Sequence, residues 1–176
     1  MAGAARLSGF MSTLRVLGID PSLVRCGWGI VDVRGSKLSH VSHGVIKPPA
    51  KRPLPERLHH LFEAVSELCE TWSPDAGAVE EAFMKDNAQS ALKLGQARAA
   101  CIVALTSRAI AVGEYSPRSV KQSVVGTGGA DKAQVAHMMN VLLPGQSLTA
   151  GDEADALAIA VCHSQRLGSG LAKALG

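Results

Sequence analysis

Val16 to Ser22, VLGIDPS, form a nearly apolar run that ends in a carboxylate and a proline. Apolar residues without polar alternation are typical of a strand buried on both faces in the middle of a sheet. Asp20 would therefore stand at the end of a central strand, where a carboxylate needs a partner because its hydration is reduced. A simple Asp-Pro turn is the alternative explanation of this residue.

The composition is typical of one globular domain that folds alone. The chain has 176 residues and a formal net charge of +3, which is too slight to indicate a polyanionic partner. Its four cysteines, Cys26, Cys69, Cys101 and Cys162, lie far apart, which favours buried thiols over a zinc site or a disulfide framework. Thiols of this kind suit a reducing compartment, so we expect a cytoplasmic protein. No apolar run approaches the roughly 20 residues of a membrane span.

Expected strands and helices alternate along the chain without an evident linker. Apolar runs predict strands over residues 13–19, 26–33, 37–46, 76–83 and 109–115. Helical periodicity and capping residues predict helices over residues 53–72, 87–108, 116–125, 131–143 and 152–167. The sequence thus predicts a flexible extension over residues 1–12, a folded domain over 13–167 and a disordered tail over 168–176.

Four carboxylates recur at the ends of these elements. Asp20 closes the first strand, Glu80 closes the fourth, and Asp152 and Asp155 share one face at the start of the last helix. An acid in the first turn of a helix has an ordinary explanation in the helix dipole. Carboxylates brought together, however, repel one another unless cations neutralise them, and oxygen ligands suit magnesium or manganese. The pattern favours a metal site.

Two neighbouring acids are expected to lie outside this site. Glu81 follows Glu80 in a strand, so its side chain points to the opposite face of the sheet. Glu153 lies about 100° around the helix from Asp152. Both are therefore excluded from the ligand set.

Basic residues flank a glycine-rich loop. Lys121 and Lys132 stand on either side of GTGG, residues 126–129, whose backbone amides can approach a phosphate closely. A flexible turn with two solvated lysines is the alternative. The histidines have no ligand spacing.

Four sequence blocks resemble the signature motifs of the RuvC family of Holliday-junction resolvases. They are LGIDPS with CGWGIV, AVEEAFMKDNAQSALKLGQARA, YSPRSVKQSVVGTGGADKAQV and GDEADALAIAV, in order between about residues 14 and 165. The resemblance implies an RNase H-like α/β fold, with a five-stranded mixed sheet flanked by helices. It also implies a homodimer that nicks four-way DNA junctions in strands of like polarity, leaving 5′ phosphates and 3′ hydroxyls. One departure is Ser22, because the family usually has glycine there.

The resemblance also implies the site residues. The family's four catalytic acids fall on Asp20, Glu80, Asp152 and Asp155, which would hold two Mg²⁺ ions, with Mn²⁺ as a substitute. We expect Asp20 to bridge the ions, Glu80 and Asp155 to bind on either side, and Asp152 to bind an ion or orient the attacking water. The residues expected to contact DNA are Phe83, Lys85, Arg118, Lys121 and Lys132, with Lys93 as a further candidate. A branch-migration helicase complex of the RuvA and RuvB type is the expected protein partner.

Two other classes of function remain open from the sequence. An actin-like ATPase or sugar kinase also begins on a strand carrying GID, but it needs a second similar half, for which this chain is short. A DNA-binding module without activity would not need all four acids. The small residues Ala88, Ala91, Ala97 and Ala99 make helix 87–108 the expected dimer interface, with packing on the sheet as the alternative.

Overall fold

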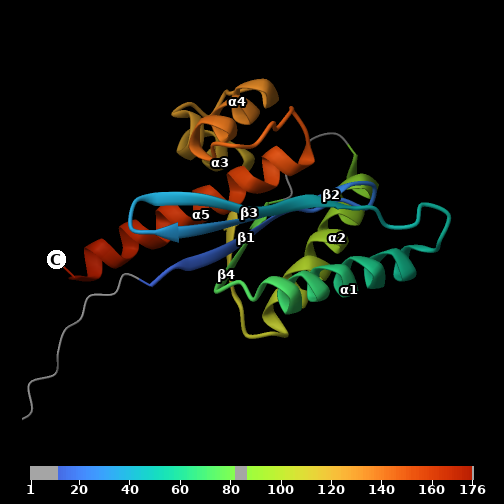
Figure 1. The fold of residues 1–176 in the computed structure, drawn as a ribbon. Helices are drawn as coiled ribbons and strands as arrows, with labels where there is room; N and C mark the ends of the chain where they lie inside the picture. Colours follow the sequence, from blue (N-terminus) through green and yellow to red (C-terminus); the bar gives the residue numbers. More distant parts are fainter. Residues whose placement is uncertain (1–11, 82–86, 176) are drawn as a thin grey trace, which may run out of the picture.

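The computed structural model describes residues 12–81 and 87–175 and contains a five-stranded mixed sheet with helices on both faces (Figure 1). The strands are β1 (Leu14–Asp20), β2 (Cys26–Arg34), β3 (Lys37–Ile46), β4 (Ala76–Glu80) and β5 (Ala111–Tyr115). The helices are α1 (Leu54–Trp72), α2 (Ala88–Thr106), α3 (Pro117–Val125), α4 (Lys132–Leu142) and α5 (Asp152–Leu175). This architecture confirms the expected RNase H-like α/β fold.

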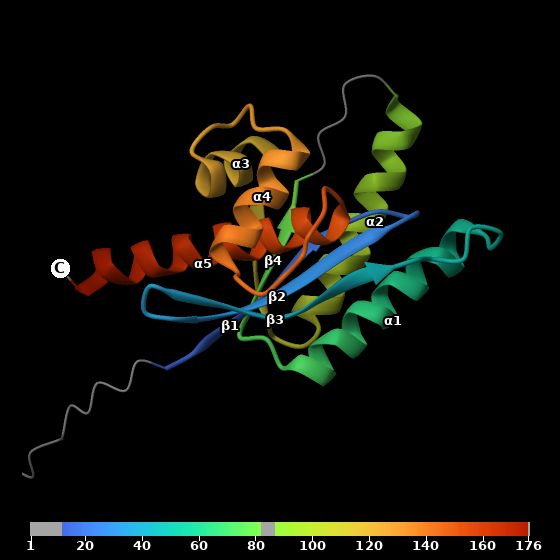
Figure 2. The ribbon, with the colours of Figure 1, turned by 45° about the horizontal axis from the view of Figure 1, so that its top comes forward.

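The sheet has the strand order β3-β2-β1-β4-β5, so β1 lies at its centre, as the apolar run predicted. β1, β2 and β3 pair antiparallel, and β4 and β5 continue parallel to β1. Helices α1 and α2 cover one face, whereas α5 crosses the other face with α3 and α4 above it (Figures 1 and 2). None of the helices in residues 12–81 and 87–175 is long and apolar enough to span a membrane.

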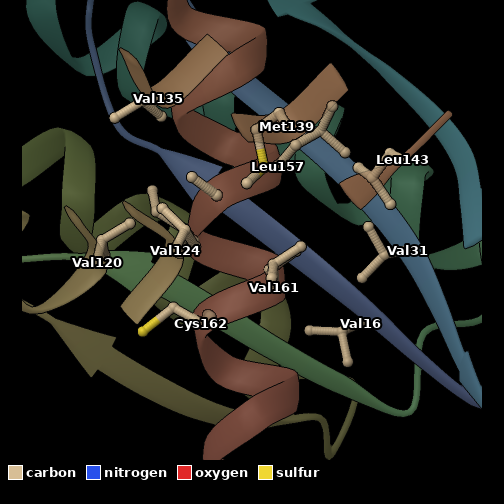
Figure 3. Close-up of a cluster of buried hydrophobic side chains, with 14 of the residues drawn as sticks. Val16, Val31, Val120, Val124, Val135, Met139, Leu143, Leu157, Val161 and Cys162 are labelled. Carbon is tan, nitrogen blue, oxygen red and sulfur yellow. The ribbon is translucent and has the colours of Figure 1, made fainter. Parts of the chain in front are cut away.

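Alternation along the strands divides the interior into two cores. Val16 and Val31 point to the core beneath α5, where side chains of α3 and α4 join them (Figure 3). Leu17, Ile19 and Ile30 point to the other core, against α1 and α2. The two cores fix which face each strand residue uses, including the acid that ends β1.

Glycines let α5 lie directly on the sheet. A Cβ atom at Gly18 would stand 2.2 Å from the carbonyl oxygen of Ala156, and one at Gly27 would stand 2.1 Å from the carbonyl oxygen of Asp152. Both distances are below any real contact, so only glycine permits this approach of helix to strand. The close packing sets the beginning of α5 over the end of β1.

The helices begin at the expected capping residues, but the last helix runs further than expected. Asn87 and Ser116 cap α2 and α3 with their side chains, as expected, and Asp131 caps α4 with a capping box. The expected disordered tail differs from the structure, because α5 continues to Leu175. LAKAL consists of good helix formers, and no proline follows the polar GSG segment to stop the helix. The expected extension over residues 1–12 lies almost entirely outside the described residues.

Candidate active site

The strand acids point toward α5. On β1, Gly18 faces α5 and Ile19 faces the opposite core, so Asp20 faces α5 again. On β4, Ala78 belongs to the core beneath α5 and Val79 to the other, which turns Glu80 to the same face as Asp20. Ile19 is paired with Val79 in the parallel ladder, so the two acids are neighbours at the carboxyl ends of adjacent strands.

The other two acids come from the start of α5. Asp152 and Asp155 lie in its first turn, and the backbone amide of Asp155 donates to the carbonyl oxygen of Gly151 at 3.1 Å. Because α5 rests on Gly27 at Asp152, this turn lies beside the end of β1. The structure therefore brings all four predicted acids to one edge of the sheet.

The electrostatics of the strand acids show how close this grouping is. Burial, followed by the charge of Asp155, raises the pKa of Asp20 from 3.8 to about 7. Burial, followed by the charges of Asp20 and Asp155, raises the pKa of Glu80 from 4.5 to about 8. The positive charge of Lys132 opposes both shifts without cancelling them. The two strand acids are thus short of positive charge.

The two helix acids have cationic partners. Lys132 Nζ lies 2.8 Å from Asp155 Oδ2, and Arg25 Nε lies 2.7 Å from Asp152 Oδ2. Glu153, which was not expected among the metal ligands, has its Oε1 atom 3.9 Å from the Arg25 guanidinium. These ion pairs neutralise part of the negative charge that α5 contributes to the site.

The donor set fits a hard divalent cation. All four side chains offer carboxylate oxygens, and the raised pKa values of Asp20 and Glu80 reflect a deficit that added positive charge would remove. Within the described ranges, no three His, Cys, Asp or Glu side chains already converge on one ion position. The ion pairs to Arg25 and Lys132 explain this, because they hold two of the four carboxylates.

The predicted DNA-contacting residues are distributed around the same edge. Lys121 lies close enough to lower the pKa of Glu80, and Lys132 is bonded to Asp155. The stem of Arg118 covers the glycine loop, because a Cβ at Gly128 would stand 2.6 Å from its Cγ. Phe83 and Lys85 lie outside the described residues.

Lys93 lies beside the β1–β2 loop. It is exposed on α2 and helps to line a cleft of about 300 Å³. The other lining residues are Ser22, Leu23, Val24, Arg57, Ser90 and Leu94.

Sequence reasoning missed two arginines. Arg25 follows Asp20 by five residues and reaches Asp152, and Arg98 of α2 donates from Nε to the carbonyl oxygen of Glu80 at 3.1 Å. Arg98 also forms an ion pair with Glu114 of β5, so it ties α2 to the ends of β4 and β5. No local pattern marks either residue, because their partners are distant in sequence.

Comparisons with known proteins point to the same family. The family model described as Crossover junction endodeoxyribonuclease RuvC matches residues 16–163. The crossover junction endodeoxyribonuclease RuvC of Maricaulis maris is 58% identical over 152 residues, covering 86% of this chain and 91% of the relative. The corresponding protein of Caulobacter vibrioides is 51% identical over 150 residues, covering 85% and 89%.

Solved structures agree with the sequence relatives. T. thermophilus RuvC in complex with a Holliday junction substrate superimposes with a TM-score of 0.83 at 34% identity, covering 89% of this chain and 96% of that one. The yeast mitochondrial Holliday junction resolvase Ydc2 has a TM-score of 0.63 at 16% identity, covering 93% and 87%, and supports the fold alone.

Proposed function

The chain belongs to the RuvC family of crossover junction endodeoxyribonucleases, and from that premise we propose that Asp20, Glu80, Asp152 and Asp155 form its catalytic centre. The protein is a metal-dependent Holliday junction resolvase, as expected, so the alternatives of an ATPase, a sugar kinase and an inactive DNA-binding module are excluded. The observation that carries the proposal is the meeting of four carboxylates from β1, β4 and α5 at one sheet edge, with the strand pair short of positive charge.

We propose that this centre holds two Mg²⁺ ions, with Mn²⁺ as a substitute. Bound ions of this kind activate water and neutralise the charge that develops on the attacked phosphate and the leaving oxygen. Asp20 is central among the four acids and is the proposed shared ligand, with Glu80 and Asp155 on either side. Asp152, the first residue of α5, binds an ion or orients the attacking water.

The basic residues serve affinity. Lys121, Lys132 and Arg118 lie around the acids and the glycine loop, where they are placed to contact the backbone of the cut strand. Contacts to phosphate carry no sequence information directly, so these residues set affinity and its salt dependence. For Phe83 and Lys85 the proposal rests on the sequence motif alone, with Phe83 stacking on an unpaired base.

We further propose a homodimer that uses the outer face of α2. Leu92 and Val103 are 65% and 53% exposed there, and Ala99 lies between them on the same face. Ala97, which the sequence analysis assigned to the interface, is instead fully buried in the core against α1. An isologous dimer carries two sites, which matches two nicks in a junction of approximate two-fold symmetry.

Three wider assignments complete the proposal. The nuclease domain begins at about residue 13, and because α5 continues to Leu175 it extends past the expected boundary at residue 167; the family match over residues 16–163 supports a single nuclease domain. The protein acts in the cytoplasm, where its four buried cysteines stay reduced. Its partner is a branch-migration complex of the RuvA and RuvB type, which would deliver the four-way junction.

Cleavage of a synthetic four-way junction in Mg²⁺, against a linear duplex of the same sequence, tests the centre. We expect the wild type to nick only the junction, and Asp20→Asn to bind it without cutting. Glu63→Gln, which neutralises an exposed acid of α1, is the matched control and should cut like the wild type. Near-normal cutting by Asp20→Asn in saturating Mg²⁺ would refute the assignment of the catalytic centre.

A further inference from the structure

The loop between β1 and β2 is held in a defined turn by Ser22. Its Oγ accepts hydrogen bonds from the backbone amides of Val24 at 3.0 Å and Arg25 at 3.2 Å. The guanidinium of Arg57 donates to the carbonyl oxygen of Leu23 at 2.5 Å, which ties the same loop to α1. Ser22 therefore gives this turn a side-chain cap.

This turn presents Arg25 to the beginning of α5. Arg25 Nε donates to Asp152 Oδ2 at 2.7 Å, and the closest approach of the guanidinium to Glu153 is 3.9 Å. Gly27, two residues later, lets the backbone of Asp152 rest on β2 and so sets this distance. The Arg25 side chain is 46% exposed, so its planar group of five N–H donors also borders solvent at the mouth of the site.

Asp152 cannot serve Arg25 and a divalent cation equally. The ion pair uses Oδ2, and a cation drawn to the same carboxylate repels the guanidinium. Because the pair is partly exposed to solvent, little opposes its separation. A guanidinium released at this position has a natural partner in a DNA phosphate, which it binds through two parallel hydrogen bonds.

We propose that Arg25 is an exchangeable counter-cation: it occupies Asp152 in the metal-free protein and passes to a phosphate of the cut strand when divalent cations and DNA bind. The inference rests on the proposed function, because it requires Asp152 to belong to the metal centre. It adds a phosphate-contacting residue from the β1–β2 loop to Lys121 of α3 and Lys132 of α4. The role of Ser22 is to aim this arginine.

Two measurements separate this role from a purely structural ion pair. Titration calorimetry with Mn²⁺ in the absence of DNA should show about threefold tighter binding by Arg25→Gln, because the competing cation is gone. In the uncleaving Asp20→Asn background with Mn²⁺, Arg25→Gln should bind a synthetic four-way junction about five- to tenfold more weakly. The slope of log affinity against log salt should fall by about 1, as expected for one lost phosphate contact.

Matched variants define the outcomes. Arg34→Gln removes an exposed arginine at the far end of β2 and should change neither measurement. Arg25→Lys should keep the salt slope but lose part of the junction affinity, because it retains the charge without the planar donor group. It also provides a folded reference if the melting temperature of Arg25→Gln is low.

The proposal is overturned if Arg25→Gln, or Arg25→Lys where the former does not fold, binds both Mn²⁺ and junction like the wild type. Failure of the metal centre itself gives a different result. In that case wild-type Mn²⁺ binding would be indifferent to Asp152→Asn and Asp20→Asn. If the centre is correct, Arg25→Gln should lose its effect on Mn²⁺ binding in the Asp152→Asn background.

Discussion

Replacing Asp20 by asparagine is expected to stabilise the metal-free protein while it abolishes cleavage. The pKa of Asp20 is raised from 3.8 to about 7, so the folded protein favours the protonated carboxyl. The stability of the folded state is therefore complete below about pH 4, where the carboxyl is protonated in both states, and is lost as the pH rises through 7. At pH 8 the difference corresponds to about 4 kcal/mol of destabilisation by the ionised carboxylate. The asparagine amide is also buried without an evident partner and keeps about half of that cost, so we expect a net gain of about 2 kcal/mol.

Thermal unfolding at pH 8 in EDTA measures this gain. For a chain of this length 2 kcal/mol corresponds to a rise in melting temperature of about 4 to 8 °C. At pH 5 the advantage of Asp20→Asn should disappear, because the carboxylate of the folded wild type is then protonated and its remaining cost no longer exceeds that of the asparagine amide. Added Mg²⁺ should raise the melting temperature of the wild type more than that of Asp20→Asn, because only the wild type keeps the full ligand set.

If Asp20→Asn melts at or below the wild-type temperature at pH 8 in EDTA, Asp20 has a stabilising partner and is not part of a cluster short of positive charge. Glu63→Gln provides the control, because Glu63 is exposed on α1 and its replacement should leave the melting temperature unchanged at both pH values.

Three further predictions concern the supporting structure. Gly18→Ala should lower the free energy of unfolding by about 3 kcal/mol in urea titrations, because its Cβ would meet the Ala156 carbonyl. Gly95→Ala, whose Cβ would have nothing within 4 Å, should raise the free energy of unfolding by about 0.5 to 1 kcal/mol, and equal effects of the two variants would contradict the packing argument. Arg98→Ala should cut junctions about tenfold more slowly in single-turnover assays at unchanged junction affinity, because the carbonyl of Glu80 loses its donor; a parallel loss of affinity would speak against a positioning role. Burial lowers the pKa of His163, so the stabilisation from its neutral form should be complete above about pH 6.5 and should decline as the pH falls toward 5. The melting temperature of His163→Gln should fall less over the same pH range.

Local pattern predicted where the four acids lie in the fold, because strand and helix periodicity are local properties. Alternation in β1 and β4 determines the face of Asp20 and Glu80, and a spacing of three residues determines the shared face of Asp152 and Asp155. Arg25 depends instead on where the start of α5 rests on Gly27, which is a tertiary property without a sequence signature.

The small residues of α2 also show what the sequence alone does not determine. Small side chains permit close packing against the sheet as readily as against a second copy, and composition does not distinguish these uses. The structure separates them, because Ala97 is buried in the core and Ala99 is on the exposed face. The exposed Leu92 and Val103 are the stronger signal for an interface, and their exposure could not be read from the weakly amphipathic helix.

The charges at the site are distributed unequally, and this inequality bears on how the centre is assembled. Among the described residues, the carboxylates of Asp155 and Asp152 each have a direct cationic partner, whereas those of Asp20 and Glu80 accept no hydrogen bond and have raised pKa values. Positive charge added between β1 and β4 therefore gains the most free energy and breaks no existing ion pair. Recruiting the α5 acids instead requires Lys132 and Arg25 to leave, and both are cations that a DNA phosphate can accept. If the proposed centre is correct, this arrangement couples its completion to the presence of the DNA strand to be cut.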